Sequence, residues 1–428
     1  MKDLIIITPM ILDLFAAYDG GPNGSYGIQL NTNKTTDSDL SVEMKTYYSD
    51  YLIDLAEAEL VHDQFAQVHD IPRNGGKTIE FRQYDTLPEL LTPLSEGVTP
   101  DGQSLSVKNL TATVQQYGGY VTISDVLDLT AIDNNILQAT KLIASQAGRT
   151  LDTITRDVIN AGTNVMYAQG AASRAALAYT SAASNNNLKV DDIKRAVRFL
   201  ETQNAPKIDG YYVGIIHPMA KYDLMNDPLW QNPHQYVDTE NMYKNEIGEL
   251  YGVRFVQSSR AKVFGDKLPN ASGTGVLTVK TAISAATTTI TIKEALSKYD
   301  AVELVGRKIV VGSASTVYTI VSATPGAANA ASIVVDASIS SAAANATIYP
   351  GDGGASHVPV YSTLILADDA YGTTKVTGGG LQHIAKQLGS AGTADPLNQR
   401  ATVGFKAMKV AEILVPQYIV RIESTATP

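Results

Sequence analysis

The sequence has no cysteine among its 428 residues. This absence excludes disulfide bridges, a thiolate nucleophile and cysteine-ligated zinc, so packing and hydrogen bonds must hold the protein together. Basic stretches are also missing, because the 33 lysines and arginines are dispersed among 43 acidic residues and leave a net charge of −10. Proteins that read a DNA sequence usually carry a basic face, so this balance argues against sequence-specific DNA binding.

Long hydrophobic runs are absent as well. No stretch approaches the ~18 uninterrupted apolar residues that a membrane span needs. The nearest candidate is residues 4–17, which Pro9 and Asp13 interrupt. Asp3 next to Lys2 spoils the positive start that a secretory signal would have. We therefore expect no membrane association, and an N-terminal arm that docks on a protein surface.

Motifs for catalysis and cofactor binding are missing too. The six histidines lack the spacing of a zinc-protease helix, and no phosphate-binding loop, dinucleotide fingerprint or nucleophile elbow occurs. The acidic pairs Asp191–Asp192 and Asp368–Asp369 could bind a hard cation. A helix cap explains the first pair equally well, and a polar loop explains the second. We predict that the chain is not an enzyme and has no catalytic, cofactor-binding or metal-binding residues.

The composition does support a large folded core, since 44% of the residues are hydrophobic and 18% are charged. Residues 1–45 are an exception, because breakers at 19–24 and a polar run at 31–39 predict an arm that cannot fold alone. Apolar residues at spacings of three and four then predict a helix over residues 41–60.

Alternating polar and apolar residues predict strands over residues 77–82 and 106–114, with a loop rich in proline and glycine between them. Another short strand is predicted over 120–124. The first two strands describe an extended hairpin. An isolated two-stranded ribbon is marginally stable in water, so we expect this hairpin to lie on a neighbouring subunit.

The strongest helix prediction covers residues 133–160, where Ile143, Ala147 and Leu151 belong to one apolar stripe. At ~1.5 Å per residue such a helix is about 40 Å long and would brace an elongated subunit. We place Asp152 and Arg156 on its polar outer face.

Strands and helices alternate over residues 190–256, which predicts an α/β domain. Residues 268–354 differ in character, because six short strands alternate with turns rich in glycine, alanine and serine. This pattern predicts a small β-sandwich or β-barrel inserted into the α/β domain. The sheet of the α/β domain would resume with strands at 358–366, 402–414 and 418–423.

Several strings resemble the major capsid proteins of tailed bacteriophages, and within them the capsid family of the N-four-type phages. They lie at residues 60–65, 74–81, 96–102, 125–130, 161–165 and 389–400. The resemblance extends over residues 34–265 and 355–425. It implies the HK97-type α+β fold, with an N-arm, an E-loop hairpin, a P-domain with a spine helix and an A-domain.

The resemblance also implies a division of the chain. The expected parts are an N-terminal arm (1–45), a helix and linker (46–74), the E-loop hairpin (75–120), the P-domain (121–184) with its spine helix (133–160), the A-domain with the C-terminal strands (185–267 and 355–428), and the inserted β domain (268–354).

The function implied is that of a shell subunit, which assembles into hexamers and pentamers in the host cytoplasm and encloses double-stranded DNA in the virion. Decoration, scaffolding and portal proteins are possible partners. Two alternatives stay open from the sequence. One is a secreted or surface adhesin, because of the β-rich insertion. The other is a hydrolase with a scattered site that uses His217 or His383.

Overall fold

The structure is a computed structural model of the whole chain. It describes residues 60–84, 87, 89–91, 93, 96, 97, 99, 102–125, 135–181, 184–230, 248–270, 273, 275–312, 316–376, 379–386, 390, 397 and 399–428. The arm predicted over residues 1–45 lies outside the described residues. So does the helix predicted over 41–60, apart from its last residue, Leu60.

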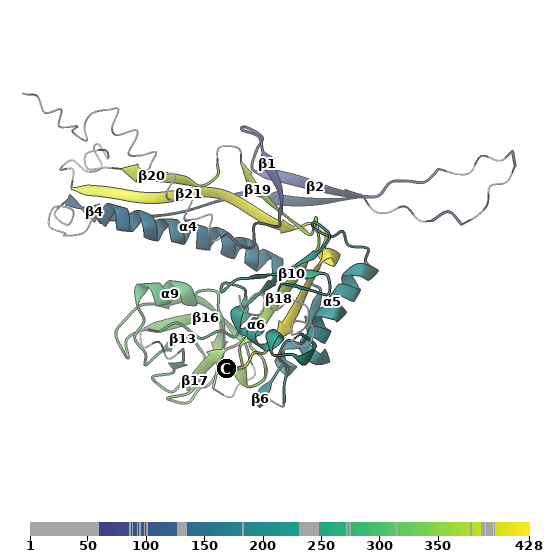
Figure 1. Cartoon of the computed structure of the whole chain (residues 1–428). Coiled ribbons are helices and arrows are strands. Elements are labelled where there is room, and N and C mark those ends of the chain that lie inside the picture. The colour runs from purple at the N-terminus through teal and green to yellow at the C-terminus, as the bar shows by residue number, and fades with distance from the viewer. Residues whose placement is uncertain are drawn as a thin grey trace, which may run out of the picture.

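A long layer of one helix on one sheet forms the upper part of the molecule in Figure 1. Its helix is α4 (Asn135–Ile159), which corresponds to the helix predicted over 133–160. The central strand is β21 (Arg400–Ile413), which pairs along its length with β4 (Gln115–Ser124), β20 (Gln382–Lys386) and β19 (Tyr371–Val376). The strand β1 (Gln67–Ile71) adds to β19 in parallel.

Packing in the long layer follows the period of about 3.6 residues in the helix and of about two residues in the strand. α4 buries Ile143, Ala144 and Ala147 against Val403 and Phe405 on the inward face of β21. Alanines at the contact let the helix approach the sheet closely, and successive inward residues of β21 are two positions apart. The result is a stiff element about 38 Å long, at ~1.5 Å for each of the 25 helical residues.

The second body is an α/β layer at the lower right of Figure 1. Its seven strands are β5 (Val165–Tyr167), β22 (Ile419–Ser424), β18 (Val360–Leu366), β8 (Tyr212–Ile216), β10 (Val253–Gln257) and β9 (Glu249–Leu250) in spatial order, with β11 (Val263–Phe264) paired to β18. The helices α5 (Val190–Thr202) and α6 (Pro218–Met225) share one hydrophobic core with this sheet.

The third body is a β-barrel formed between residues 268 and 350, with its own hydrophobic core. Its sheet runs in the order β12 (Leu277–Thr278), β17 (Thr347–Pro350), β14 (Lys308–Val311), β15 (Tyr318–Thr324), β16 (Ser332–Ile339) and β13 (Thr287–Thr291). A bridge between Val279 and Ile292 joins the two ends of this order. The strands therefore close into a barrel.

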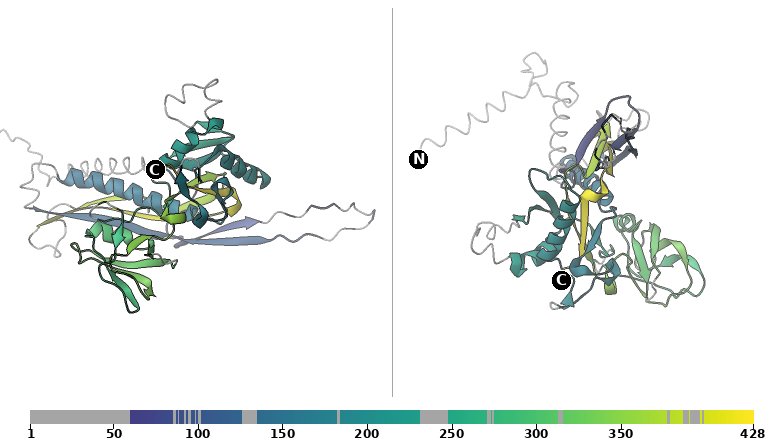
Figure 2. Two further views of the ribbon diagram at one scale, coloured as in Figure 1. Left: turned by 90° about the horizontal axis from the view of Figure 1, so that it is seen from below. Right: turned by 90° about the vertical axis from the view of Figure 1, so that its right-hand side faces the viewer.

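A hairpin of β2 (Thr78–Tyr84) and β3 (Val107–Thr113) extends beyond the right end of the long layer in Figure 1. Figure 2 shows that the barrel and the α/β layer diverge from each other below the long layer. The remaining elements are α9 (Lys298–Leu304), β6 (Tyr179–Ser181), β7 (Ser184–Asn185), and the 3₁₀ turns η1 (Ala168–Gly170), η2 (Arg174–Ala176), η3 (Ala355–His357) and η5 (Pro416–Tyr418).

Two boundaries differ from the predicted division. Residues 115–120, which were assigned to the hairpin, lie in β4 and pair with β21. Residues 371–413, which were assigned to the A-domain, form β19, β20 and β21 of the long layer. Both differences have one cause, because the partner of a strand lies far away in the sequence and local alternation does not identify it. Among the described helices, none is long and apolar enough to cross a membrane.

Candidate assembly interface

The hairpin packs on its own subunit at its root and exposes apolar side chains near its tip. At the root, cross-strand pairs place Ile79 opposite Ala112 and Phe81 opposite Leu110 on one face. The ring of His69 on β1 meets Phe81 edge-on at 5.5 Å. Beyond the strands, Leu90 and Leu91 are 80% and 85% exposed, and Leu87 and Leu105 are exposed as well. Among the described residues, none covers these leucines.

The segment at the hairpin tip is also acidic. Residues 85–106 contain no lysine or arginine, and their acidic residues are Asp85, Glu89, Glu96 and Asp101. Clustered apolar side chains that remain exposed usually mark an interaction site. A surface that receives this tip should therefore combine apolar walls with positive charge.

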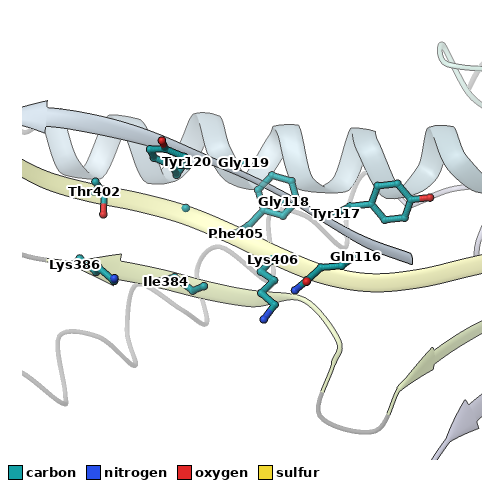
Figure 3. A pocket seen from close by; sticks show the side chains of 11 residues that line it. Gln116, Tyr117, Gly118, Gly119, Tyr120, Ile384, Lys386, Thr402, Phe405 and Lys406 are labelled. Carbon is teal, nitrogen blue, oxygen red and sulfur yellow. The ribbon is translucent and has the colours of Figure 1, made fainter. Parts of the chain in front are cut away.

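A groove of about 530 Å³ with these properties lies on the long layer (Figure 3). It follows β4, β21 and β20, and α4 covers the opposite side of these strands. Tyr120 and Ile384 are exposed in it and flank Gly404, with which both are paired in register. Lys386 and Lys406 are the charged residues in its lining.

Residue 404 has to be a glycine, because its backbone forms the floor of the groove and leaves no room for a side chain. A Cβ atom there would lie 2.8 Å from the carbonyl oxygen of Gly119 and 2.9 Å from the Cβ of Tyr120. Side-chain carbons do not approach backbone and side-chain atoms so closely. The missing side chain therefore leaves a notch between Tyr120 and Ile384.

A buried polar cluster fixes the chain that leads into the hairpin. The backbone nitrogen and Nδ1 of His62 bond the two carboxylate oxygens of Asp152 at 2.8 and 2.9 Å. The hydroxyl of Tyr371 donates to the backbone oxygen of His62 at 2.5 Å. The side chains of His62 and Asp152 are completely buried.

Asp63, the next residue along the chain, completes the cluster by binding a lysine of β21. It accepts hydrogen bonds from the hydroxyl of Thr155, at 2.5 Å, and from the ammonium of Lys409. Lys409 also donates to the carbonyl oxygen of Leu151 at 3.1 Å. Two carboxylates therefore tie residues 62 and 63 to both the helix and the central strand of the long layer.

The pKa values of these groups reflect burial and pairing. Burial alone would raise the pKa of Asp152, but its hydrogen bonds from His62 and the charge of that ring outweigh burial and lower the pKa. Burial lowers the pKa of Lys409, and the nearby Asp63 opposes part of this change. Burial, together with the charges of Asp63 and Asp152, raises the pKa of Tyr371.

The prediction that Asp152 lies on the outer face of the helix was wrong. Asp152 follows Leu151 on the buried stripe, and its carboxylate is neutralised within the fold instead of by water. Lys409 was missed as a partner. It lies two residues from Ala407 and Ala411, so the strand period placed a cation among inward-facing residues. That anomaly was the available signal for the cluster.

The other residues noted in the sequence do not come together. His217 caps α6, where its Nδ1 accepts from the backbone nitrogen of Met219 at 3.2 Å. His383 is on β20 of the long layer, in a different sheet. Asp192 caps α5 by accepting from the backbone nitrogen of Lys189 at 3.1 Å, as the cap interpretation predicted. Among the described residues, no group of three or more potential metal ligands gathers.

Comparison with known families decides between the open alternatives. Residues 108–278 match the family described as phage capsid protein, a segment that runs from β3 through α4 and most of the α/β layer. Over this segment the chain is similar to phage capsid proteins. Phage capsid proteins are structural subunits, which disfavours the hydrolase and the adhesin.

Solved structures show the same fold. The capsid of the cyanophage P-SCSP1u has a TM-score of 0.50 with 13% identity, over 85% of this chain and 87% of that chain. The capsid of the cyanophage Pam1 also has a TM-score of 0.50, with 10% identity, over 82% and 86%. The chain therefore has the mixed α+β fold of HK97-like phage capsids. No curated protein sequence matches this chain.

Proposed function

We propose that this chain is the major capsid protein in the head shell of a tailed double-stranded DNA phage, and that its copies close into hexamers and pentamers. The observation that carries the proposal is the projecting hairpin, whose tip exposes Leu90 and Leu91. Since none of the described residues covers these side chains, we infer that another molecule does. A neighbouring copy of the same chain satisfies this need at every subunit of a closed ring.

The groove on the long layer is our proposed receptor for the hairpin of the adjacent copy. Its apolar walls, Tyr120 and Ile384, match the leucines of the tip. Lys386 and Lys406 match the acidic residues between 85 and 101. Each contact buries a small area, but a lattice repeats it many times and gains avidity.

The parts of the fold take the following proposed roles. The long layer is the P-domain, with α4 as its spine, β2–β3 is the E-loop, and the α/β layer is the A-domain at the capsomer centre. Residues 1–45 are the N-terminal arm. The barrel is an insertion into the A-domain that forms an outward knob on the shell, since it has a separate core.

The finer identity rests on the sequence strings, such as residues 74–81 and 389–400. We assign the protein to the N-four-type capsid family on that basis. The acidic net charge of −10 suits a shell that encloses DNA without binding its sequence. Assembly in the host cytoplasm, with scaffolding, portal and decoration proteins as partners, completes this proposal.

The test removes the hairpin contact without touching the core. The variant Leu90→Ser/Leu91→Ser should fold but should yield few or no particles in electron micrographs of the purified protein. Leu142→Ser is the matched control, because Leu142 is also exposed and lies on α4. Particle formation by the hairpin variant at the level of the control would contradict the proposal.

A charge exchange tests the groove as the receptor. Lys386→Glu/Lys406→Glu should reduce particle yield by about tenfold or more, because like charges then face each other. Adding Glu89→Lys/Glu96→Lys to the same chain should restore the yield. If the added changes lower the yield further, the hairpin binds elsewhere on its neighbour.

A further inference from the structure

The notch at Gly404 lies in the middle of a row of three residues that crosses the outward face of the long layer. Gly404 is paired in register with Ile384 of β20 on one side and with Tyr120 of β4 on the other. Its chain neighbours Val403 and Phe405 pack on α4. Successive residues of a strand point to opposite faces, so the row of Gly404 faces away from the helix.

Each of the two neighbouring rows on this face carries one lysine. Lys406 follows Gly404 by two residues on β21, and Lys386 pairs with Thr402, two residues before Gly404. At ~3.4 Å per residue the two lysine rows are about 14 Å apart, with the notch midway between them. Among the described residues, no ion pair includes either lysine. The groove therefore offers a positive, an apolar and a positive position in that order along β21.

The sequence that follows β2 has the complementary order. Leu87 is preceded by Asp85 and followed by Glu89, each two positions away. These are the only acidic residues four positions apart between residues 85 and 106. Residues two positions apart in an extended chain share one face, and four positions span ~14 Å. The spacing of the two carboxylates therefore equals that of the two lysine rows.

The proline at position 88 favours binding on the face of the sheet. The residue before a proline is biased towards extended backbone, which is the conformation that the spacing requires of Leu87. Proline has no backbone N–H, so this segment is poorly suited to pair as a further strand along the edge of β20. Leu87 is 51% exposed and thus available to a partner.

We propose that this segment sets the register of the contact between adjacent copies. Leu87 of one copy fills the notch above Gly404 of the next, and the carboxylates of Asp85 and Glu89 pair with the two lysines. The inference rests on the proposed function, which supplies the adjacent copy. β2 and β3 project beyond the end of the long layer that is opposite to β20 (Figure 1), so the contact is made head-to-tail and can close a ring.

A charge exchange at matched positions tests the register. In the chain that has both groove lysines replaced by glutamate, Asp85→Lys/Glu89→Lys should raise the particle yield by at least about tenfold, because opposite charges face each other again. Glu96→Lys/Asp101→Lys is the matched control, since it makes the same change of charge in the same segment at a spacing of five residues. Equal recovery from both pairs would overturn the register and leave the hairpin contact standing.

The absence of cysteine from the chain allows a second, independent readout. Gently oxidised particles of Leu87→Cys/Ile384→Cys should contain chains linked between residues 87 and 384, identified in peptide mass spectra. Leu91→Cys/Ile384→Cys is the control, because Leu91 is also exposed but lies four residues further along the segment. We expect at least about tenfold less linkage from the control, since a disulfide requires the two Cβ atoms to come within about 4.5 Å.

The outcomes separate this inference from the proposed function. Intact particles in which residue 91 is linked as efficiently as residue 87 would overturn the register alone. If the cysteine variants form no particles, the charge exchange decides the register by itself. Absence of particles from the unaltered chain would overturn the proposed function and this inference together.

Discussion

Buried charge is unusual, because removing a charged group from water is costly unless a partner compensates it. In this protein, residues 62 and 63 use such pairs to attach the segment that leads into β1 and the hairpin to α4 and β21. Hydrogen bonds and ion pairs are directional, so this attachment fixes the orientation of the segment as well as its distance from α4 and β21. Hydrophobic packing alone would allow this segment to take several registers against the long layer.

Removing the cation should therefore destabilise the fold. Lys409→Met leaves the partly buried carboxylate of Asp63 without its ion pair, at an expected cost of ~3–5 kcal/mol in the free energy of unfolding. Denaturant unfolding of the unassembled chain measures this cost. Lys406→Met on the same strand is the control, with an expected change within about 0.5 kcal/mol, because Lys406 faces the groove. Equal losses in both variants would contradict the role of the cluster.

Acid should weaken the same cluster. The pKa of Asp152 in the fold lies below its ordinary value of 3.8, so the folded chain favours the carboxylate form. The stabilisation is complete above pH 3.8 and is lost as the pH falls through the lower, folded value. Asp152→Asn should flatten the decline of the unfolding free energy in this range. Asp191→Asn, at an exposed carboxylate of α5, is the control and should leave the decline unchanged.

At the scale of the element, the sequence patterns located those segments whose periodicity is strong. The stripe of α4, the alternation in β2 and β3 and the six strands of the barrel all appear in the structure close to their predicted positions. The strands β1, β19 and β20 and the helix α9 were missed. They are short, and the strands are completed by distant partners, such as β19 by β21, which the local sequence does not encode.

The same distinction between local and distant features applies to the candidate assembly interface. The hairpin followed from the sequence, because the alternation in its strands and the proline and glycine in its loop are local features. The groove did not, because it exists only where β4 and β20 meet opposite sides of β21. Its floor depends on one missing side chain, which no local pattern distinguishes from a turn glycine.

The close approach of β4 to β21 at Gly404 predicts the effect of adding a side chain there. Gly404→Ala forces a Cβ atom against β4 and should cost about 1–3 kcal/mol in unfolding free energy, as overpacking does elsewhere. Gly380→Ala is the control, since a Cβ atom there meets nothing within 4 Å. Thermal unfolding of the two unassembled variants measures the difference. A melting temperature for Gly404→Ala equal to that of the control would contradict the close contact of β21 and β4.

At the scale of the whole molecule, the barrel leaves and rejoins the α/β layer at one place. A Cβ atom on Gly265 would lie 2.5 Å from the Cα of Gly353, so the two backbones touch. The backbone nitrogen of Gly265 also donates to Asp352 at 2.9 Å. A guest with adjacent ends can be added to or removed from a host without displacing the strands of the host.

Deletion of the barrel should therefore leave the folding and the assembly of the shell subunit intact. Removing residues 268–352 takes out the complete barrel core, including Leu268, and a short glycine–serine linker can join Lys267 to Gly353. The shortened chain retains the hairpin and the groove, so particles should form and should withstand heating as those of the full chain do. Electron microscopy and light scattering during heating measure both outcomes. Leu90→Ser/Leu91→Ser is the opposite case, since it keeps the barrel and loses the hairpin contact. If the shortened chain folds but forms no particles, the barrel belongs to the lattice itself and is not a knob on its outside.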